Sequence, residues 1–405
     1  MTIPVDEILE DLEVSRADPG PGFLERLFLR FNERVPFETA SKIRRHAQVA
    51  NPVDKPRLPE IFWRERLESG AGGTCFARVA AFDALLRGLG FVTRLALGRV
   101  RSDFDHAALF VFTADTEWLC DAGFPLPALL PARLARVETP LGGLEVTRTA
   151  RGLRVDFDGG VPDGPRHLEV FDAPLAEGEF EARWRETFRA DSKFLSEVVL
   201  HRILANRRTV FARGSLRIDD LHSRLRIPLE SPRSGALEAA FGVEASFLDE
   251  AFALAGDPDP ESGNASVEAF LESPVPSESA FSAIATPEGY TALHAGFARV
   301  TTASVGPGAF SVRLVPEGGG GEPPPLEETV RIDDAAKTVA VSREGRDSSW
   351  IAEEREGVPW LVRRTILEGP RLDLLRNDSL RGRLAGILAL DLLAWTRRLA
   401  AGSRP

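Results

Sequence analysis

The apolar residues of this chain change their spacing at Phe91, and that change limits the folds open to it. Up to that point they recur at helical intervals, first around residues 23–31 and again from Cys75 to Leu89. Beyond it come short runs typical of strands, at 91–100, 107–112, 118–121, 144–146, 153–157 and 167–171. Later segments are mixed, helical at 194–205 and 237–254 and strand-like at 210–218. We therefore predict helices first, then a strand-rich region, then a mixed segment.

Residues 256–263 have the composition of a linker, and we place a domain boundary there. The first domain then covers residues 1–255 and the second covers residues 256–405. The second contains strand-like runs at 298–303, 310–315, 338–341 and 361–367. It ends in a long apolar helix at 379–400, for which Ser379 is the expected N-cap. The glycine- and proline-rich stretch 318–325 is expected to be a loop.

The composition argues against several classes of protein. Of the 405 residues, 43% are hydrophobic and 27% are charged, a balance typical of globular chains. A net charge of -11 argues against nonspecific binding to nucleic acids or anionic membranes. The N-terminus lacks the features of a secretory signal, and no segment is apolar for long enough to span a bilayer. With only two cysteines, both expected to be free thiols, we predict a cytoplasmic location.

The segment Gly72-Gly73-Thr74-Cys75-Phe76 is followed along the chain by His106 and Asp121. A thiol becomes a strong nucleophile when an imidazole takes its proton and a carboxylate orients that imidazole. Cys75 opens a predicted helix that Thr74 is placed to cap, so the thiol is expected at the positive end of the helix dipole. The glycine pair allows a sharp turn before the thiol.

His106 and Asp121 lie on successive predicted strands, and a hairpin turn at 113–116 would bring them face to face. Each residue also has a purely structural interpretation: a buried cysteine, a histidine in a buried strand and an aspartate in a turn. The combination favours a cysteine acyl-transfer site over these separate interpretations. We assign Cys120 to the core and expect no zinc or other metal site, because the spacing of paired cysteine ligands is missing.

At these residues the chain resembles the arylamine N-acetyltransferases. The family signature, Arg-Gly-Gly-x-Cys-Phe followed by a His and by Asp-x-Gly-Phe, matches residues 71–76, His106 and residues 121–124. Residues 35–38, Val-Pro-Phe-Glu, resemble a further family motif, and the likeness extends over about residues 1–255. The resemblance implies an α+β fold like that of cysteine proteases. It would have a helical bundle (1–90), a small β-barrel (91–190) and an α/β lid (191–255). The additional α+β domain, 256–405, is weakly similar to helix-grip ligand-binding domains.

The resemblance also implies an activity and a set of site residues. Cys75 would take an acetyl or other short acyl group from acetyl-CoA or another acyl-CoA and pass it to an arylamine, hydrazine or other small amine. His106 would act as base and then as acid, and Asp121 would orient it. The residues expected to line the acceptor site are Phe37, Gly123 and Phe124, and the one expected near the donor is Ser102. Neither a nucleic acid nor a membrane is implied as a partner.

The chain departs from the family pattern at Ala71, Ala77 and Pro125. Asp103 and Asp105, close to Ser102, are expected to repel the phosphates of a coenzyme. These departures leave three alternatives open. One is an amide synthase acting on carrier-bound acyl chains, and a more distant one is a hydrolytic or transglutaminase-like use of the same residues. The third is a degenerate, non-catalytic ligand-binding protein.

Overall fold

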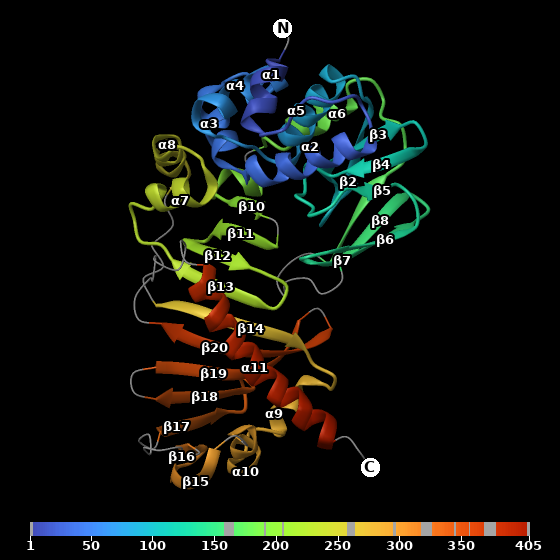
Figure 1. Cartoon of the computed structure of the whole chain (residues 1–405). Coiled ribbons are helices and arrows are strands. Elements are labelled where there is room, and N and C mark those ends of the chain that lie inside the picture. The colour runs from blue at the N-terminus through green and yellow to red at the C-terminus, as the bar shows by residue number, and fades with distance from the viewer. Residues whose placement is uncertain are drawn as a thin grey trace. The chain divides into compact units, whose positions relative to one another are not determined.

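Figure 1 shows the computed structural model of the chain. It describes residues 3–157, 166–189, 192–204, 206–256, 264–294, 297–316, 326–343, 346–355, 357–367 and 378–402. The chain forms two compact units, Met1–Leu221 with Leu229–Ser262, and His222–Pro228 with Gly263–Pro405. The expected linker at 256–263 lies outside the described residues except for Gly256, and so does the whole of the expected loop at 318–325.

Helices dominate the first ninety residues, as the spacing of apolar residues predicts. They are α1 (Val5–Asp11), α2 (Pro21–Arg34), α3 (Ala40–Gln48), α4 (Pro59–Ser69) and α5 (Cys75–Gly88), with a short 3-10 turn η1 (Pro52–Asp54). Aromatic side chains hold them together: the ring of Phe31 lies 4.7 Å from that of Phe82 and 5.9 Å from that of Trp63, and all three are fully buried. Such contacts add to the hydrophobic burial that stabilises the bundle.

The strand-rich region forms one antiparallel sheet that packs against α5 through β2 and β3. Its strands are β2 (Val92–Arg99), β3 (Asp103–Thr113), β4 (Thr116–Cys120), β5 (Leu130–Pro131), β6 (Ala135–Thr139), β7 (Gly142–Arg148), β8 (Gly152–Phe157) and β9 (His167–Phe171). Their order is β5-β4-β3-β2-β9-β8-β7-β6. Helix α6 (Glu179–Glu186) follows, and its Phe180 and Trp184 pack on Phe76 of α5.

The helix predicted at 194–205 is wrong. That stretch contains a 3-10 turn, η2 (Lys193–Leu195), and then strand β10 (Leu200–Leu204), which pairs with β11 (Arg207–Ala212) and with β1 (Phe37–Glu38). A short apolar run is compatible with the residue spacing of a helix or of a strand, and here pairing with two neighbouring strands makes it a strand. The single strand expected at 210–218 is a hairpin, because β12 (Ser215–Asp219) turns back on β11. Two helices, α7 (Ser234–Phe241) and α8 (Ala245–Ala255), replace the single helix expected at 237–254.

The second unit is an antiparallel sheet with one long helix against it. Its strands run in the order β13-β14-β20-β19-β18-β17-β16-β15. They are β13 (Ser223–Pro228), β14 (Ala265–Glu272), β15 (Phe297–Gly306), β16 (Ala309–Pro316), β17 (Leu326–Asp333), β18 (Thr338–Arg343), β19 (Arg346–Arg355) and β20 (Val358–Leu367). Short helices α9 (Ser277–Ser282) and α10 (Pro287–Thr291), with the 3-10 turn η3 (Ala292–His294), lie between β14 and β15 in the chain.

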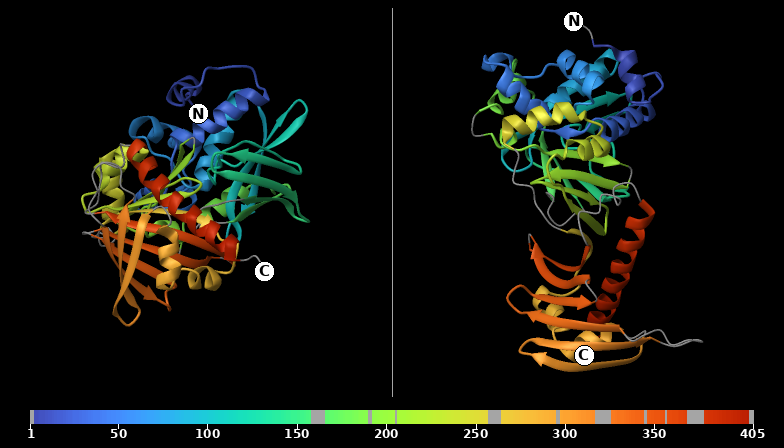
Figure 2. Two further views of the ribbon diagram at one scale, coloured as in Figure 1. Left: turned by 60° about the horizontal axis from the view of Figure 1, so that its bottom comes forward. Right: turned by 90° about the vertical axis from the view of Figure 1, so that its left-hand side faces the viewer.

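Helix α11 (Asp378–Gly402) runs along one face of this sheet (Figure 2). It includes Ser379, so the prediction that Ser379 is its N-cap is wrong. Trp395 on α11 is fully buried, stacks edge-on against Trp350 at 5.6 Å and donates its indole N–H to the Ala280 carbonyl at 3.2 Å. Among the described helices, none combines the length and apolarity needed to cross a bilayer.

Candidate functional site

Cys75 is the first residue of α5, as the sequence predicts. The turn before it is held against β1, because Gly73 N donates to the Pro36 carbonyl at 3.3 Å and Glu38 N donates to the Gly73 carbonyl at 3.1 Å. Thr74 occupies the N-cap position, but its side chain makes no capping hydrogen bond, so that expectation is wrong. Cys75 is 8% exposed, with its Sγ 3.9 Å from the Asp105 carbonyl oxygen.

Gly72 permits this close approach, and its replacement by alanine should destabilise the protein. A Cβ on Gly72 would lie 1.8 Å from the Pro36 carbonyl oxygen, a backbone atom that cannot move aside alone. We expect Gly72→Ala to lower the free energy of unfolding by about 3 kcal/mol, measured by urea denaturation. Gly235→Ala in α7 is the matched control, because nothing lies within 4 Å of the added Cβ. Equal stabilities of the two variants would contradict this account of the turn.

His106 lies on β3 and Asp121 follows the end of β4, and the two side chains meet. His106 Nε2 is 2.7 Å from Asp121 Oδ2. The hairpin register differs from the predicted one: Leu109 faces Cys120, so that Ala108 rather than His106 would stand opposite Asp121. Because side chains alternate between the two faces of a sheet, this two-residue shift leaves His106 and Asp121 on the same face. The predicted contact therefore forms diagonally.

The carboxylate of Asp121 is fully buried and fixed from both sides. Its second oxygen, Oδ1, accepts hydrogen bonds from the backbone N–H groups of Gly123 at 3.1 Å and Phe124 at 2.8 Å. Arg78, also fully buried, donates from Nε to the Ala122 carbonyl at 2.7 Å and ties this turn to α5. The Asp121 turn and the Cys75 helix are thus joined by a guanidinium that the sequence analysis did not single out.

Gly123 lies at the point where the cysteine and the histidine come together. A Cβ built on Gly123 would be 2.9 Å from Cys75 Cβ and 3.1 Å from His106 Cε1. Burial lowers the pKa of His106, but the charge and hydrogen bond of Asp121, together with Cys75, outweigh it and raise that pKa to about 10. His106 is therefore protonated at neutral pH. An imidazolium next to a thiol favours the reactive thiolate.

Two of the three residues expected at the acceptor site lie directly beside Cys75 and His106. Gly123 lies between them as described, and the ring of Phe124 stands edge-on to the His106 ring at 6.5 Å. Phe37, on β1, is bridged to Gly73 and packs against Phe194 at 5.6 Å. The structure thus places Phe37 next to the turn that precedes the thiol.

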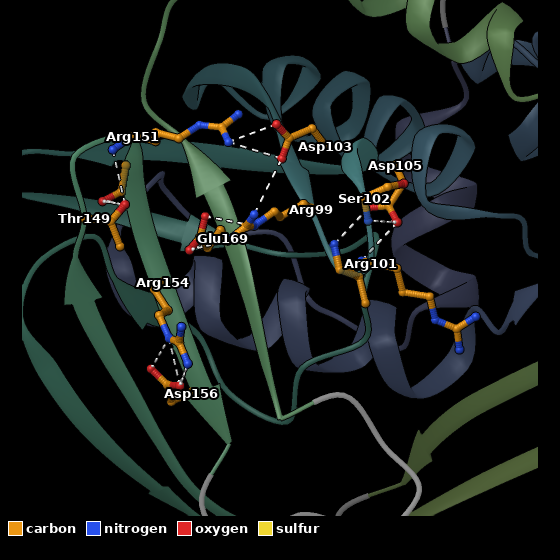
Figure 3. A network of polar contacts seen from close by, with 12 residues as sticks. Arg99, Arg101, Ser102, Asp103, Asp105, Thr149, Arg151, Arg154, Asp156 and Glu169 are labelled. Carbon is orange, nitrogen blue, oxygen red and sulfur yellow. Dashed lines mark hydrogen bonds and ion pairs between the residues drawn. The ribbon is translucent and has the colours of Figure 1, made fainter. Parts of the chain in front are cut away.

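Ser102, expected near the donor, lies exposed in the loop between β2 and β3 (Figure 3). Asp105 holds this loop: its carboxylate accepts hydrogen bonds from the backbone N–H groups of Val100, Arg101 and Ser102 at 2.8, 3.1 and 3.0 Å. These three amide N–H groups are therefore already bonded to the Asp105 carboxylate, next to Ser102.

Asp103, the other acidic residue of this loop, is also compensated. Its carboxylate forms an ion pair with Arg151 at 2.9 Å and lies 3.8 Å from Arg99 (Figure 3). Arg99 in turn pairs with Glu169 at 3.1 Å on the neighbouring strand β9. The surface at this end of the sheet is therefore a network of opposite charges rather than an acidic patch.

The residues that depart from the family pattern are all buried: Ala71, Ala77 and Pro125. Ala71 leaves no arginine at that position of the motif, yet a buried guanidinium is present nearby. Arg57 donates from Nη2 to the Gly72 carbonyl at 2.6 Å and lies 3.8 Å from the buried Glu38 carboxylate. Arg57 and Lys42, another buried cation near Cys75, were not identified from the sequence. The rarity of lysine in this chain, four residues in 405, was the one available signal for Lys42.

Comparison with known proteins finds a family and solved structures to which this chain is similar. The model of a family described as N-acetyltransferase matches residues 22–144. The arylamine N-acetyltransferase of Mycobacterium abscessus is 23% identical, with a TM-score of 0.53, over 62% of this chain and 95% of its own. The enzyme of M. smegmatis is 18% identical, with a TM-score of 0.55, over 64% of this chain and 99% of its own. The enzyme of M. marinum, solved in complex with CoA, is 17% identical, with a TM-score of 0.53, over 61% of this chain and 97% of its own.

None of the curated proteins compared with the chain matches it. The family model and the solved structures confirm the resemblance expected from the sequence. At these identities, the solved structures show that the matched part of this chain shares the fold of arylamine N-acetyltransferases.

Proposed function

We propose, on the premise that residues 1–255 resemble the arylamine N-acetyltransferases, that this protein moves an acyl group from an acyl-CoA through Cys75 to an amine. The contact of His106 with Asp121 at 2.7 Å, beside Cys75, is the observation that carries the proposal. Cys75 is the nucleophile, His106 the proton carrier and Asp121 the orienting group that thiol acyl transfer requires. The proposal concerns residues 1–255 alone.

In the first step, the Cys75 thiolate attacks the carbonyl carbon of the donor thioester, and the bond from that carbon to the coenzyme sulfur breaks. The departing coenzyme thiolate takes the proton of the His106 imidazolium. In the second step, the acceptor amine attacks the Cys75 thioester while neutral His106 takes the amine proton. The Cys75–acyl bond then breaks, which restores the thiolate and imidazolium. Asp121 keeps the imidazole in one orientation throughout.

Acylation of Cys75 by acetyl-CoA tests this proposal directly. After incubation without an acceptor, we expect intact-mass analysis to show one added acetyl group, which is absent in Cys75→Ala and released when an arylamine is added. Cys120→Ala is the matched control, because Cys120 is fully buried and the pKa of its thiol is raised well above the usual value by burial. If no short acyl-CoA modifies the protein, or if modification survives Cys75→Ala, the proposal fails.

A carrier-bound acyl chain is a second candidate donor. The observation that favours it is the hydrogen bonding of Asp105 to the amides of residues 100–102, which are therefore not available to a nucleotide phosphate. An amide synthase of this type would be acylated at Cys75 by a carrier-protein thioester and not by the matching acyl-CoA. Comparing the two donors at equal concentration decides between them.

A further inference from the structure

Lys42, on α3, places a buried positive charge near Cys75. The side chain is 4% exposed, and its Nζ is 3.2 Å from the Ser192 hydroxyl oxygen. The same Nζ lies 5.2 Å from the ring centre of Phe188 and 5.8 Å from that of Phe194. Phe194 packs on Phe37, so Lys42 borders the group of residues proposed to contact the acceptor.

Nothing in the described part of the chain neutralises this charge with a carboxylate. Lys42 has a hydroxyl and two aromatic rings as neighbours, which interact favourably with an ammonium but leave its charge uncompensated. Burial lowers the pKa of Lys42 to about 8, and the charge of Cys75 opposes that shift only in part. Two other buried cations of this unit differ, since Arg57 lies beside Glu65 and Arg66 pairs with Asp11.

Acylation of Cys75 changes the surroundings of Lys42. The thiolate is the anion that favours the charged form of this lysine, and conversion to a thioester removes that negative charge. In the acyl-enzyme Lys42 then lacks this neighbouring charge, and a buried charge without a counter-ion is costly. An anion brought by the substrate would replace the charge that the reaction removes.

We propose that Lys42 binds a carboxylate carried by the substrate, close to the reacting thioester. This inference rests on the proposed function and specifies its substrate class. The carboxylate belongs either to the acyl group or to the acceptor amine. In both cases a charge-assisted hydrogen bond to Nζ, in surroundings shielded from water by Phe188 and Phe194, favours the carboxylated substrate over a neutral analogue of the same shape.

Paired substrates test the proposal in two arms. In the donor arm, succinyl-CoA is compared with pentanoyl-CoA for acylation of Cys75. In the acceptor arm, an aminobenzoate is compared with the corresponding aminobenzamide, with acetyl-CoA as donor. We expect the charged substrate of one arm to have the higher kcat/KM by roughly ten- to hundredfold in the native protein. Lys42→Met should bring that ratio close to one, and Lys42→Arg should retain part of it.

The quantity compared is the ratio of kcat/KM for the charged substrate to that for the neutral one within each variant. A general loss of activity lowers both values and leaves this ratio unchanged. Lys337→Met is the matched control, because Lys337 pairs with Glu278 at the surface of the second unit. A ratio near one in both arms, or a preference that Lys42→Met leaves intact, overturns the proposal while transfer itself stands.

Protection of Cys75 from iodoacetamide by the aminobenzoate, relative to the aminobenzamide, tests the same contact without any donor. This measurement separates the failure of carboxylate binding from the failure of acyl transfer. If Cys75 accepts no acyl group but is protected by the aminobenzoate in a Lys42-dependent way, the binding inference stands and the proposed reaction is wrong. Absence of protection assigns the carboxylate to the acyl group, and absence of protection together with a ratio near one in the donor arm overturns the inference.

Discussion

Replacing Asp121 with asparagine is expected to slow acyl transfer by roughly 10⁴-fold, as in other triads that lose this carboxylate. The amide carries no negative charge, so the interactions that raise the pKa of His106 are mostly lost and burial, which lowers that pKa, prevails. His106 would then be neutral at pH 7. Without the imidazolium, the thiolate form of Cys75 loses the neighbouring positive charge that favours it.

The pH dependence of Cys75 alkylation measures this effect without a substrate. In the native protein, we expect the rate to be constant from pH 7 until His106 loses its proton near pH 10. In Asp121→Asn the rate should be low at pH 7 and rise with pH. Asp103→Asn is the matched control, because Asp103 is an exposed partner of Arg151 outside the triad. Identical profiles for native protein and Asp121→Asn would contradict the assigned role of Asp121.

The same shift links His106 to stability. Its folded-state pKa lies above the unfolded value of about 6.5. The stabilisation that protonated His106 provides is therefore fully present below pH 6.5 and is lost as the pH rises through about 10. Comparing urea unfolding of the native protein with that of Asp121→Asn at pH 6 and pH 10 should show the larger difference at pH 6.

Gly123→Ala is expected to separate the nucleophile from its base. The added Cβ would lie 2.4 Å from the Ala107 carbonyl oxygen, in addition to its close contacts with Cys75 and His106. The Asp121 turn must move away to relieve these contacts. A displacement of about 1 Å at such a site lowers the rate roughly 10²-fold, and we expect a loss of this size in alkylation of Cys75 at pH 7.

A glycine in strand β7 provides the control for this variant. A Cβ on Gly143 would meet the guanidinium of Arg136, the far end of a flexible side chain, so Gly143→Ala should retain the native rate. A native rate in Gly123→Ala would mean that the turn tolerates the extra methyl group and does not set the distance between Cys75 and His106.

The proximity of Cys75, His106 and Asp121 could be predicted from the sequence because it depends on local patterns. A glycine pair before a helix, and a histidine and an aspartate on adjacent strands, are visible in residue types and spacing. The register was two residues out, because pairing His106 with Asp121 would centre the turn one position before the centre set by the Thr113–Thr116 pair. Side chains alternate between the two faces of a sheet, so an error of two residues still leaves both side chains on one face and preserves the predicted contact.

What the sequence could not show depends on contacts between distant segments. Strand β10 was predicted as a helix because its pairing with β1, more than 160 positions earlier, cannot be read from the residues of β10 itself. Lys42 becomes notable only when burial and its neighbour Ser192, 150 residues away, are known. Asp391 in α11 accepts a hydrogen bond from Nε of Arg363 at 3.1 Å, a partner on β20 that the helix pattern alone does not indicate.

Strand β13 has a consequence for any attempt to separate the two units. Residues 223–228 belong to the sheet of the second unit, where they pair with β14, although 229–262 return to the first. Cutting the gene at codon 256 would leave β13 on one fragment and its hydrogen-bonding partner on the other. Each fragment would then carry an open sheet edge, the kind of surface on which chains aggregate. Expression of either half alone therefore requires a different cut site, or a graft that restores the missing strand.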